Sequence, residues 1–265
     1  MTVRYFDSLV HTTDDGSWLG STRYDASYDR LMRELDAVPN SRACLVAIAG
    51  HVDNQWVMEH SERSQGRLVP VGSINPAEYS TSTGAEAAVQ ELFEQGFRGL
   101  KLHPRLGDYD PLDERNLAAI EAACDVGLVV FLDTLFRQPR RLTRHASDVI
   151  DQVAQISTSG RVVLLHGGGP AMLEVFDLVR MHTHLVLDLS FSLMRYAGSS
   201  LDADMQFIFQ QLDQRVTIGS DMPEYTPTQA LARFEALTVG LGDEKRQNIL
   251  WRNLEMLFPS PANVS

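Results

Sequence analysis

Histidine and aspartate side chains stand at the ends of short β-forming runs in this 265-residue sequence. His11 closes the run "VRYFDSLVH", His166 closes "RVVLLH" ahead of three glycines, and Asp221 follows "RVTIGS". Imidazole and carboxylate groups together can hold a divalent metal such as zinc or manganese, which lowers the pKa of a bound water. Without a metal, the same groups can perform general acid–base hydrolysis, because histidine titrates near neutral pH.

Three more β-forming runs end in ionisable residues. His51 follows the run "ACLVAIAG", Lys101 and His103 end "FRGLKLH", and Asp133 ends "LVVFLD". Alternation along a strand places Lys101 and His103 on one face. One such residue by itself is more often a cap or a solvated loop residue. Six of eight runs ending in this way favour a shared pocket.

The apolar runs predict eight strands separated by helix-length amphipathic segments. The expected strands cover residues 3–10, 43–50, 67–74, 97–103, 128–133, 161–166, 184–190 and 215–220. Apolar strands that alternate with helices indicate a parallel sheet, and about 250 residues is typical of a (β/α)8 TIM-type barrel. A doubly wound open sheet is the alternative, but no Gly-x-Gly-x-x-Gly motif or P-loop opens the first helix. We predict one α/β barrel domain over residues 1–265.

A barrel would bring these strand ends together. The carboxyl ends of all strands open onto one mouth, and catalytic groups lie there. Residues 12–26, with Trp18 and Tyr24, form the longest loop between a strand and a helix and are expected to act as a lid. The sequence contains no Gly-x-Ser-x-Gly motif, which argues against a serine nucleophile.

Composition excludes several other classes of protein. The formal net charge of -12 argues against a broad surface for nucleic acid or anionic membranes. No apolar run approaches the roughly 18 residues that span a bilayer, and the N-terminus lacks a secretory pattern. Cys44 and Cys124 lie inside apolar segments, which indicates buried free thiols in a reducing compartment. We expect a soluble, cytoplasmic protein.

The chain resembles the amidohydrolase superfamily, in particular its amidohydrolase-related (amidohydrolase 2) branch. The resemblance rests on the order of "YFDSLVH", "GFRGLKLHPR", "RVVLLHGGG", "RVTIGSDMP" and "NILWRNLEMLF". It implies a metal-using barrel with ligands His-x-His on the first strand, histidines on the fifth and sixth, and aspartate on the eighth. In this chain the first position is Leu9 and the fifth-strand position is Asp133, so the ligand set is altered.

Two hypotheses follow from the altered ligand set. In one, His11, Asp133 and Asp221 hold one divalent metal, and Lys101 or His103 fills the gap left at Leu9. In the other there is no metal, and Asp221 acts as general base on a water, as metal-free lactone hydrolysis in this branch would allow. The two hypotheses have equal support at this level.

We predict a hydrolase acting on a small carboxylated lactone, ester or amide. Asp221 would accept the proton of the attacking water, and His166 would polarise the carbonyl. We expect an anionic substrate, because arginine and other cationic side chains bind carboxylates. The candidate binding residues are Lys101, His103, Arg105, Arg137 and Arg195. The alternatives are non-oxidative decarboxylation of a related acid, which the branch also supports, and an inactive barrel kept as a binding module. The resemblance also implies a homodimer.

Overall fold

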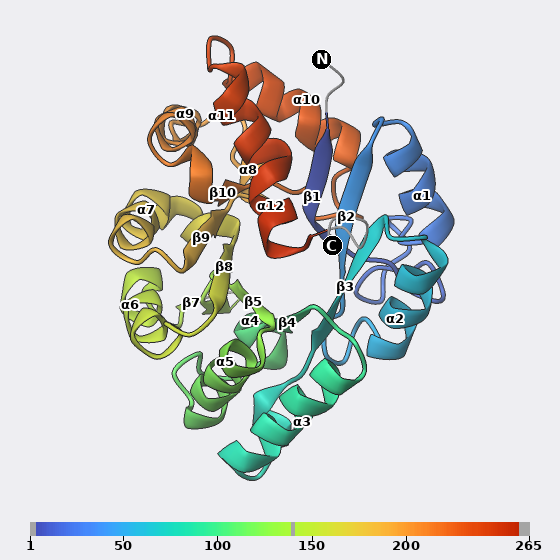
Figure 1. Cartoon of the computed structure of the whole chain (residues 1–265), viewed down its shortest axis with the longest axis vertical. Coiled ribbons are helices and arrows are strands. Elements are labelled where there is room, and N and C mark those ends of the chain that lie inside the picture. The colour runs from blue at the N-terminus through green and yellow to red at the C-terminus, as the bar shows by residue number, and fades with distance from the viewer. Residues whose placement is uncertain (1–3, 139–140, 260–265) are drawn as a thin grey trace.

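Eight parallel strands surround a central axis in the computed structural model, which describes residues 4–138 and 141–259 (Figure 1). Their hydrogen-bonded order is β1-β2-β3-β4-β5-β8-β9-β10, so each strand pairs with the next strand of the barrel along the chain. This arrangement confirms the predicted (β/α)8 barrel. The strands are β1 (Tyr5–Val10), β2 (Ser41–Val46), β3 (Leu68–Ser73), β4 (Gly99–Leu102), β5 (Val129–Asp133), β8 (Arg161–Leu165), β9 (Leu185–Asp188) and β10 (Val216–Thr217).

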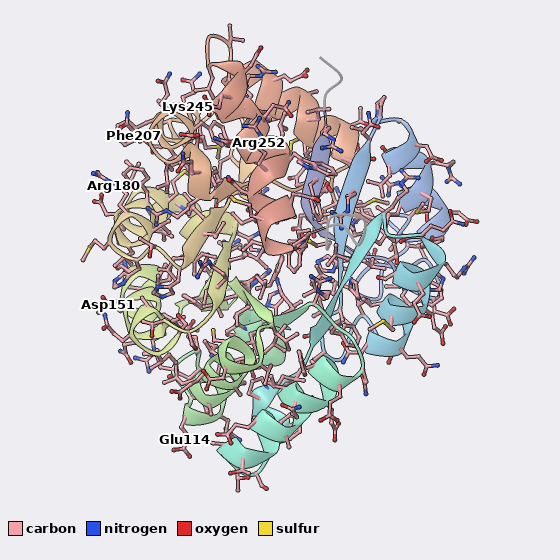
Figure 2. All side chains as sticks on the ribbon, in the orientation of Figure 1. Glu114, Asp151, Arg180, Phe207, Lys245 and Arg252 are labelled. Atoms are coloured by element: carbon pink, nitrogen blue, oxygen red, sulfur yellow. The ribbon has the colours of Figure 1, made fainter. Side chains whose placement is uncertain are left out.

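Amphipathic helices cover the outside of the strands. Charged side chains such as Glu114, Asp151 and Arg180 point away from the barrel (Figure 2). The long helices are α1 (Tyr28–Asp36), α2 (Asn54–Arg63), α3 (Ser82–Glu94), α5 (Glu114–Val126), α6 (Ala146–Ile156), α7 (Met172–Met181), α9 (Leu201–Gln211) and α10 (Pro227–Leu237).

Shorter elements lie in the connections. They are α4 (Pro104–Gly107), α8 (Ser192–Arg195), the 3-10 turns Pro76–Glu78, His166–Ala171 and Asp213–Arg215, and the hairpin β6 (Arg137–Gln138) with β7 (Arg141–Leu142). The hairpin lies between β5 and α6 and was not predicted. The expected closing helix is continuous but irregular, with α11 (Asp243–Gln247), a π-helical turn (Asn248–Arg252) and α12 (Asn253–Leu257).

The barrel interior is filled rather than hollow. Alternate strand residues, among them Phe6, Val46 and Phe131, form a buried apolar cluster inside the strands. Trp251 and Phe258 from the C-terminal segment join this cluster at the amino ends of the strands. The cavity-lining groups of the site must therefore lie at the other end, which is the normal location in this fold.

Closure between β10 and β1 depends on a glycine. Ser8 N–H donates to the Ile218 carbonyl at 3.2 Å, and Asp221 N–H donates to the Leu9 carbonyl at 3.0 Å. A Cβ atom on Gly219 would lie 2.4 Å from Ser8 Oγ and 2.8 Å from an Asp7 carboxylate oxygen. Only glycine lets the two strands approach this closely. The approach also carries Asp221 to the mouth beside β1.

A further expectation is met. Cys44 and Cys124 are free and buried. Among the helices of the described residues, none combines the length and the apolarity that crossing a bilayer requires.

Candidate active site

Six predicted side chains lie together at the carboxyl ends of the strands. Five of them come from strand ends or from the residue just beyond, and all except Lys101 lie within ion-pair distance of another member. They are His11 after β1, Lys101 and His103 at the end of β4, Asp133 at the end of β5, His166 after β8, and Asp221 after β10. We refer to these six residues as the mouth cluster.

Asp133 is the anionic centre of the mouth cluster and is fully buried. Its Oδ2 lies 3.3 Å from His103 Nε2, 3.2 Å from His166 Nε2 and 3.8 Å from the Arg105 guanidinium. Burial alone would raise the pKa of Asp133, but His103 and His166 hold that pKa well below its usual range. Asp133 is therefore ionised.

The two histidines on Asp133 differ in charge. His103 Nδ1 accepts from the Leu106 N–H at 3.4 Å, which leaves Nε2 as the protonated nitrogen, and Nε2 faces Asp133 Oδ2 at 3.3 Å. Burial lowers the pKa of His103 well below 6.5, so this ring is neutral. His166 Nδ1 donates to the Ser190 carbonyl at 3.0 Å. Burial opposes its charge, yet Asp133 raises the pKa of His166, which favours an imidazolium.

His11 and Asp221 form a second pair. His11 Nδ1 donates to the Val46 carbonyl at 2.6 Å, and burial lowers the pKa of His11 to about 3. Its Nε2 is therefore an acceptor, and it faces Asp221 Oδ1 at 3.7 Å. Burial also raises the pKa of Asp221 to about 6. Two acceptors that face each other make a place for a water or hydroxyl that donates to both.

Lys101 lies among these groups without a partner of its own. Its side chain is 1% exposed. Within the described residues its ammonium has no hydrogen bond and no ion pair within 4.0 Å. Burial lowers the pKa of Lys101, while the carboxylates of Asp133 and Asp221 act in the opposite direction. Its N–H donors are therefore available to a bound molecule.

Unusual backbone angles aim two of the side chains into the mouth. His166 and Asp221 have φ values of 65° and 57°, a region that few residues with a Cβ adopt. Gly167, Gly168 and Gly169 continue the turn after His166 with positive φ. A Cβ on Gly168 would lie 2.7 Å from Val175, so the turn packs directly on α7. Such strain concentrates at functional sites.

The loop of residues 12–26, the predicted lid, reaches His11 of this pair through Trp18. The Trp18 ring stacks on His11 with centroids 5.1 Å apart, and Trp18 Nε1 donates to Glu224 at 3.2 Å. Tyr24 packs instead against the core of the barrel wall. Trp18 is thus the lid residue that reaches the mouth cluster.

Two predicted binding residues do not join the mouth cluster. The side chains of Arg137 and Arg195 are exposed, and in the described part of the chain neither forms an ion pair with the cluster. Arg137 lines a neighbouring cavity of about 320 Å³ together with Thr134 and Gly168. Arg105 does belong to the cluster through its contact with Asp133.

Sequence reasoning did not assign roles to some residues that hold the site in place. Asp188 ends β9 and accepts from the Ser190 N–H at 3.0 Å, which fixes the carbonyl that orients His166. Asp7 accepts from the Leu9 and Ser220 N–H groups at 3.1 and 2.9 Å, where the barrel closes. Both follow the pattern of an acidic residue in an apolar run, which could have identified them.

The side chains present do not fit the predicted metal site. Among the described residues, no three His, Cys, Asp or Glu side chains are placed to hold a metal ion. The proposed ligands are divided, because Asp133 is engaged by His103 and His166 while His11 pairs with Asp221. Leu9 belongs to the apolar interior. Metal content therefore stays a prediction.

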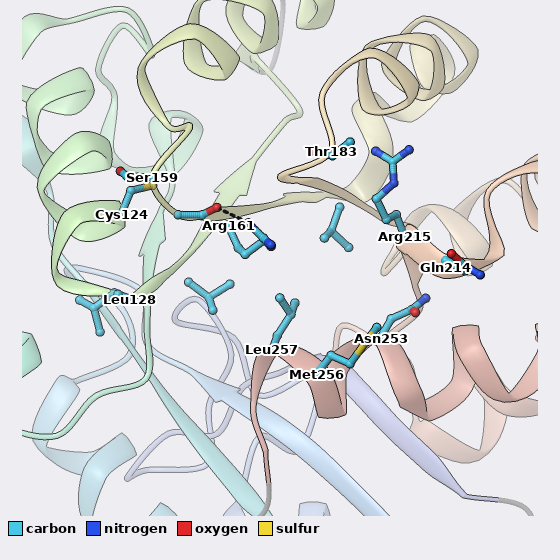
Figure 3. Close-up of a pocket in the computed structure, with 14 residues that line it drawn as sticks. Cys124, Leu128, Ser159, Arg161, Thr183, Gln214, Arg215, Asn253, Met256 and Leu257 are labelled. Carbon is cyan, nitrogen blue, oxygen red and sulfur yellow. Dashed lines mark hydrogen bonds between the residues drawn. The ribbon is translucent and has the colours of Figure 1, made fainter.

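A larger cavity of about 490 Å³ lies at the opposite end of the barrel (Figure 3). It is lined by the starts of β5, β8 and β9 and by α12, with Cys124, Leu128, Arg161 and Met256 among its residues. None of the mouth cluster lines it. Its size alone does not make it the catalytic pocket, because the six titratable side chains of the mouth cluster lie at the other end of the barrel.

Solved structures with the same fold extend along the whole chain. An uncharacterized TIM-barrel protein, Bb4693, from Bordetella bronchiseptica has a TM-score of 0.82 and 21% identity, covering 96% of this chain and 98% of its own. 5-Carboxyvanillate decarboxylase from Sphingomonas paucimobilis has a TM-score of 0.70 and 12% identity, covering 97% and 99%. A zinc-bound amidohydrolase from Burkholderia multivorans has a TM-score of 0.69 and 14% identity, covering 98% and 100%.

Sequence comparison gives a family. No curated protein matches the chain significantly. The family model described as amidohydrolase matches residues 15–259, which leaves β1 with Leu9 and His11 outside the match. With nearly all of its strand-end residues inside that match, the chain belongs to the amidohydrolase family.

Proposed function

We propose that this protein hydrolyses a small carboxylated lactone, ester or amide with a water activated at the mouth of the barrel. The observation that carries the proposal is the pair of Asp221 and neutral His11, 3.7 Å apart at the mouth. Burial raises the pKa of Asp221 to about 6, which suits a general base at neutral pH.

The protons can be followed through the reaction. Water donates one hydrogen to Asp221 and the other to His11 Nε2, which orients its lone pair toward the substrate carbonyl carbon. Asp221 takes the proton as the carbon–oxygen bond forms, and later returns it to the departing alkoxide or amine. This is one general base acting in turn as general acid.

Lys101 supports stabilisation of the carbonyl oxygen better than His166 does. Both nitrogens of His166 are engaged, by Ser190 and Asp133, whereas the Lys101 ammonium has no partner among the described residues. A buried cation beside a developing oxyanion stabilises the transition state. His166 and Asp133 then act as positioning residues.

Arg105 is the candidate for the substrate's carboxylate. Its side chain is 34% exposed at the rim, and its guanidinium lies 3.8 Å from Asp133 Oδ2. Arginine holds carboxylates in a planar fork. The substrate class is therefore an anion whose reacting carbonyl lies a short distance from a carboxylate.

A screen of carboxylated lactones, esters and amides in ¹⁸O-labelled water tests the proposal. Incorporation of one solvent oxygen into the product is expected, with kcat/KM rising as the pH rises through about 6 while Asp221 ionises. Absence of turnover across the screen, from a folded protein, would favour the inactive barrel that serves as a binding module.

Decarboxylation is the second candidate, since 5-carboxyvanillate decarboxylase and 2,6-dihydroxybenzoate decarboxylase share the fold at TM-scores of 0.70 and 0.68. Release of carbon dioxide from hydroxybenzoate-type acids, without solvent oxygen in the product, would identify decarboxylation rather than hydrolysis as the reaction. Elemental analysis of protein purified without chelator would show in either case whether zinc or manganese accompanies the activity.

A further inference from the structure

The cavity at the amino end of the barrel carries positive charge in an acidic protein. Its volume is about 490 Å³, and two arginines line it, Arg161 at the start of β8 and Arg215 in the turn before β10 (Figure 3). The described residues that line it include no aspartate and no glutamate, although the chain has 35 acidic residues against 23 lysines and arginines. The cavity therefore favours an anionic ligand.

Two aspartates adjoin lining residues in the sequence, and both are held by other partners. Asp125 accepts from Ser159 Oγ at 2.8 Å, and Asp213 accepts from Asn248 Nδ2 at 2.7 Å. Neither aspartate lines the cavity. The charge of the two arginines is thus not cancelled by a carboxylate on the cavity wall.

Arg215 is fixed in position but keeps donors for a ligand. Its Nη1 donates to the Val179 carbonyl and, at 3.0 Å, to the His182 carbonyl, both at the end of α7. Within the described part of the chain, its other guanidinium nitrogens have no hydrogen bond and no carboxylate lies within 4.0 Å. A guanidinium has five N–H donors and stays charged at neutral pH, so Arg215 can donate to an anion.

Arg161 lies on a different wall of the cavity (Figure 3). Its Nη1 donates to the Gly160 carbonyl at 2.9 Å, and no carboxylate of the described residues lies within 4.0 Å of its guanidinium. Arg115 and Arg233, in contrast, each form an ion pair with an aspartate. Both arginines of the cavity are therefore available to bind carboxylates, which a guanidinium holds in a planar fork.

Apolar side chains form much of the remaining wall. They come from the starts of the strands and from α12, and they are Leu128, Val129, Val186, Met256 and Leu257. An inorganic anion would leave this apolar surface in contact with water, whereas an organic anion would cover it. The volume of the cavity is in the range of small-molecule sites.

We propose that this cavity binds a small organic dianion, a dicarboxylate, with one carboxylate on Arg161 and the other on Arg215. The hydrocarbon part of the ligand would lie against the apolar wall. The site is separate from the mouth cluster, and the inference does not rest on the proposed function. The ligand would connect β8, α12 and the turn before β10, so its binding should stabilise the folded protein.

Calorimetric titration of the full-length protein with dicarboxylates of increasing length tests the inference. The series is succinate, glutarate, adipate and pimelate, and the control for each is the straight-chain monocarboxylate with the same number of carbon atoms. We expect the best dicarboxylate to bind on the order of tenfold more tightly than its monocarboxylate and to raise the Tm. Equal affinity for dianions and monoanions, or no saturable binding by any member, would overturn the proposal.

Variants locate the binding. Arg161→Gln removes the charge and should weaken the best dicarboxylate on the order of tenfold. Arg180→Gln is the matched control and should leave the affinity unchanged, because Arg180 points away from the barrel on α7 (Figure 2). Arg105→Gln should also leave it unchanged. Loss of binding in Arg105→Gln, with none in Arg161→Gln, would place the dicarboxylate at the mouth and contradict the inference.

Hydrogen exchange of the wild-type protein covers the case in which Arg161→Gln does not fold. The dicarboxylate should slow amide exchange in residues 159–161 and 253–257 and leave residues 103–107 and 220–224 at the mouth unchanged. Protection at the mouth alone would show that the cavity is not the binding site. Binding needs no turnover, so a failed hydrolysis screen leaves this result independent.

Discussion

At the carboxyl ends of the strands the barrel holds a set of titratable side chains, while at the amino ends it is closed by apolar ones. Asp133 and Lys101 are buried at the mouth, and Asp221 takes a positive φ there. At the other end the ring centroids of Trp251 and Phe6 are 5.6 Å apart, and those of Phe258 and Phe131 are 6.0 Å apart. Burial of charged side chains at the mouth lowers the stability of the folded protein. Burial of apolar surface at the closed end raises it.

Because of this difference, substitutions that lower activity and substitutions that lower stability should lie at opposite ends of the barrel. A change at the mouth should remove activity while leaving the fold as stable as before or more so. A change at the closed end should lower stability and leave the activity of each folded molecule intact. Stability–activity trade-offs of this kind are general.

The largest effect on activity is expected for Asp221→Asn. Loss of the general base should lower kcat by about 10²- to 10⁴-fold. Because burial raises the pKa of Asp221 to about 6, its ionised form destabilises the folded protein at pH 7, and the neutral amide should raise the free energy of unfolding by up to about 3 kcal/mol. Steady-state kinetics and urea unfolding of the same sample measure both.

Full activity in Asp221→Asn would remove the proposed mechanism. A large loss of stability would show instead that the carboxylate is structural. Asparagine tolerates the positive φ of this position, so the backbone itself gives no reason for unfolding.

Phe258→Ala should have the largest effect on stability. The side chain is 1% exposed and packs inside the amino end of the barrel. Its truncation should lower the free energy of unfolding by about 3–5 kcal/mol, with kcat unchanged per folded molecule. Denaturant unfolding with an active-site titration checks this, and Met256→Ala, 67% exposed on the same segment, is the control.

A comparable loss of kcat in folded Phe258→Ala would contradict the separation of the two ends. It would show that the closed end positions the mouth through the strands.

Asp7 should make stability depend on pH. Burial raises its pKa to about 7. The folded state therefore binds this proton more tightly than the unfolded state, so its stabilisation is full below pH 4 and is lost as the pH rises through 7. Asp7→Asn should remove this slope and stabilise the protein by a few kcal/mol above pH 7.

Unfolding measured from pH 4 to 9 on both proteins tests this. An identical slope in wild type and Asp7→Asn would assign the pH dependence to other groups. Asp221, with a pKa of about 6, contributes in the same direction, so the double variant should be flattest.

The smallest effect is expected for Trp18→Leu in the lid. Loss of the stack on His11 and of the hydrogen bond to Glu224 should raise KM several-fold while changing the free energy of unfolding by about 1 kcal/mol or less. Kinetics with the substrate found by the screen checks it. Glu224→Gln, which keeps an acceptor for Trp18, should lie close to wild type, and a larger effect there would give Glu224 a role of its own.

The barrel and the identity of the strand-end residues could be predicted from the sequence. Period-two burial and apolar runs are local properties, so all eight strands were located, with β10 shorter than expected because Asp7 takes the N–H of Ser220 near its end. The clustering of His11, Asp133, His166 and Asp221 followed from the rule that the carboxyl ends of barrel strands meet.

The roles of those residues could not be predicted, because they depend on contacts between distant segments. Burial lowers the pKa of His11 to about 3 despite the hydrogen bond to the Val46 carbonyl, whereas Asp133 raises the pKa of His166 against the effect of burial. Arg137 and Arg195 look like Arg105 in sequence, yet only Arg105 reaches Asp133. Residue types can be read from the chain, whereas partners and protonation states cannot.

The amino-acid sequence by itself therefore determined the fold, the family and the set of chemical groups at the mouth, since these follow from local patterns and strand direction. Only the tertiary structure decided which groups are paired, which are charged and which, like Lys101, lack a partner among the described residues. The physical reason is that burial and pairing energies arise between side chains that are remote in the chain.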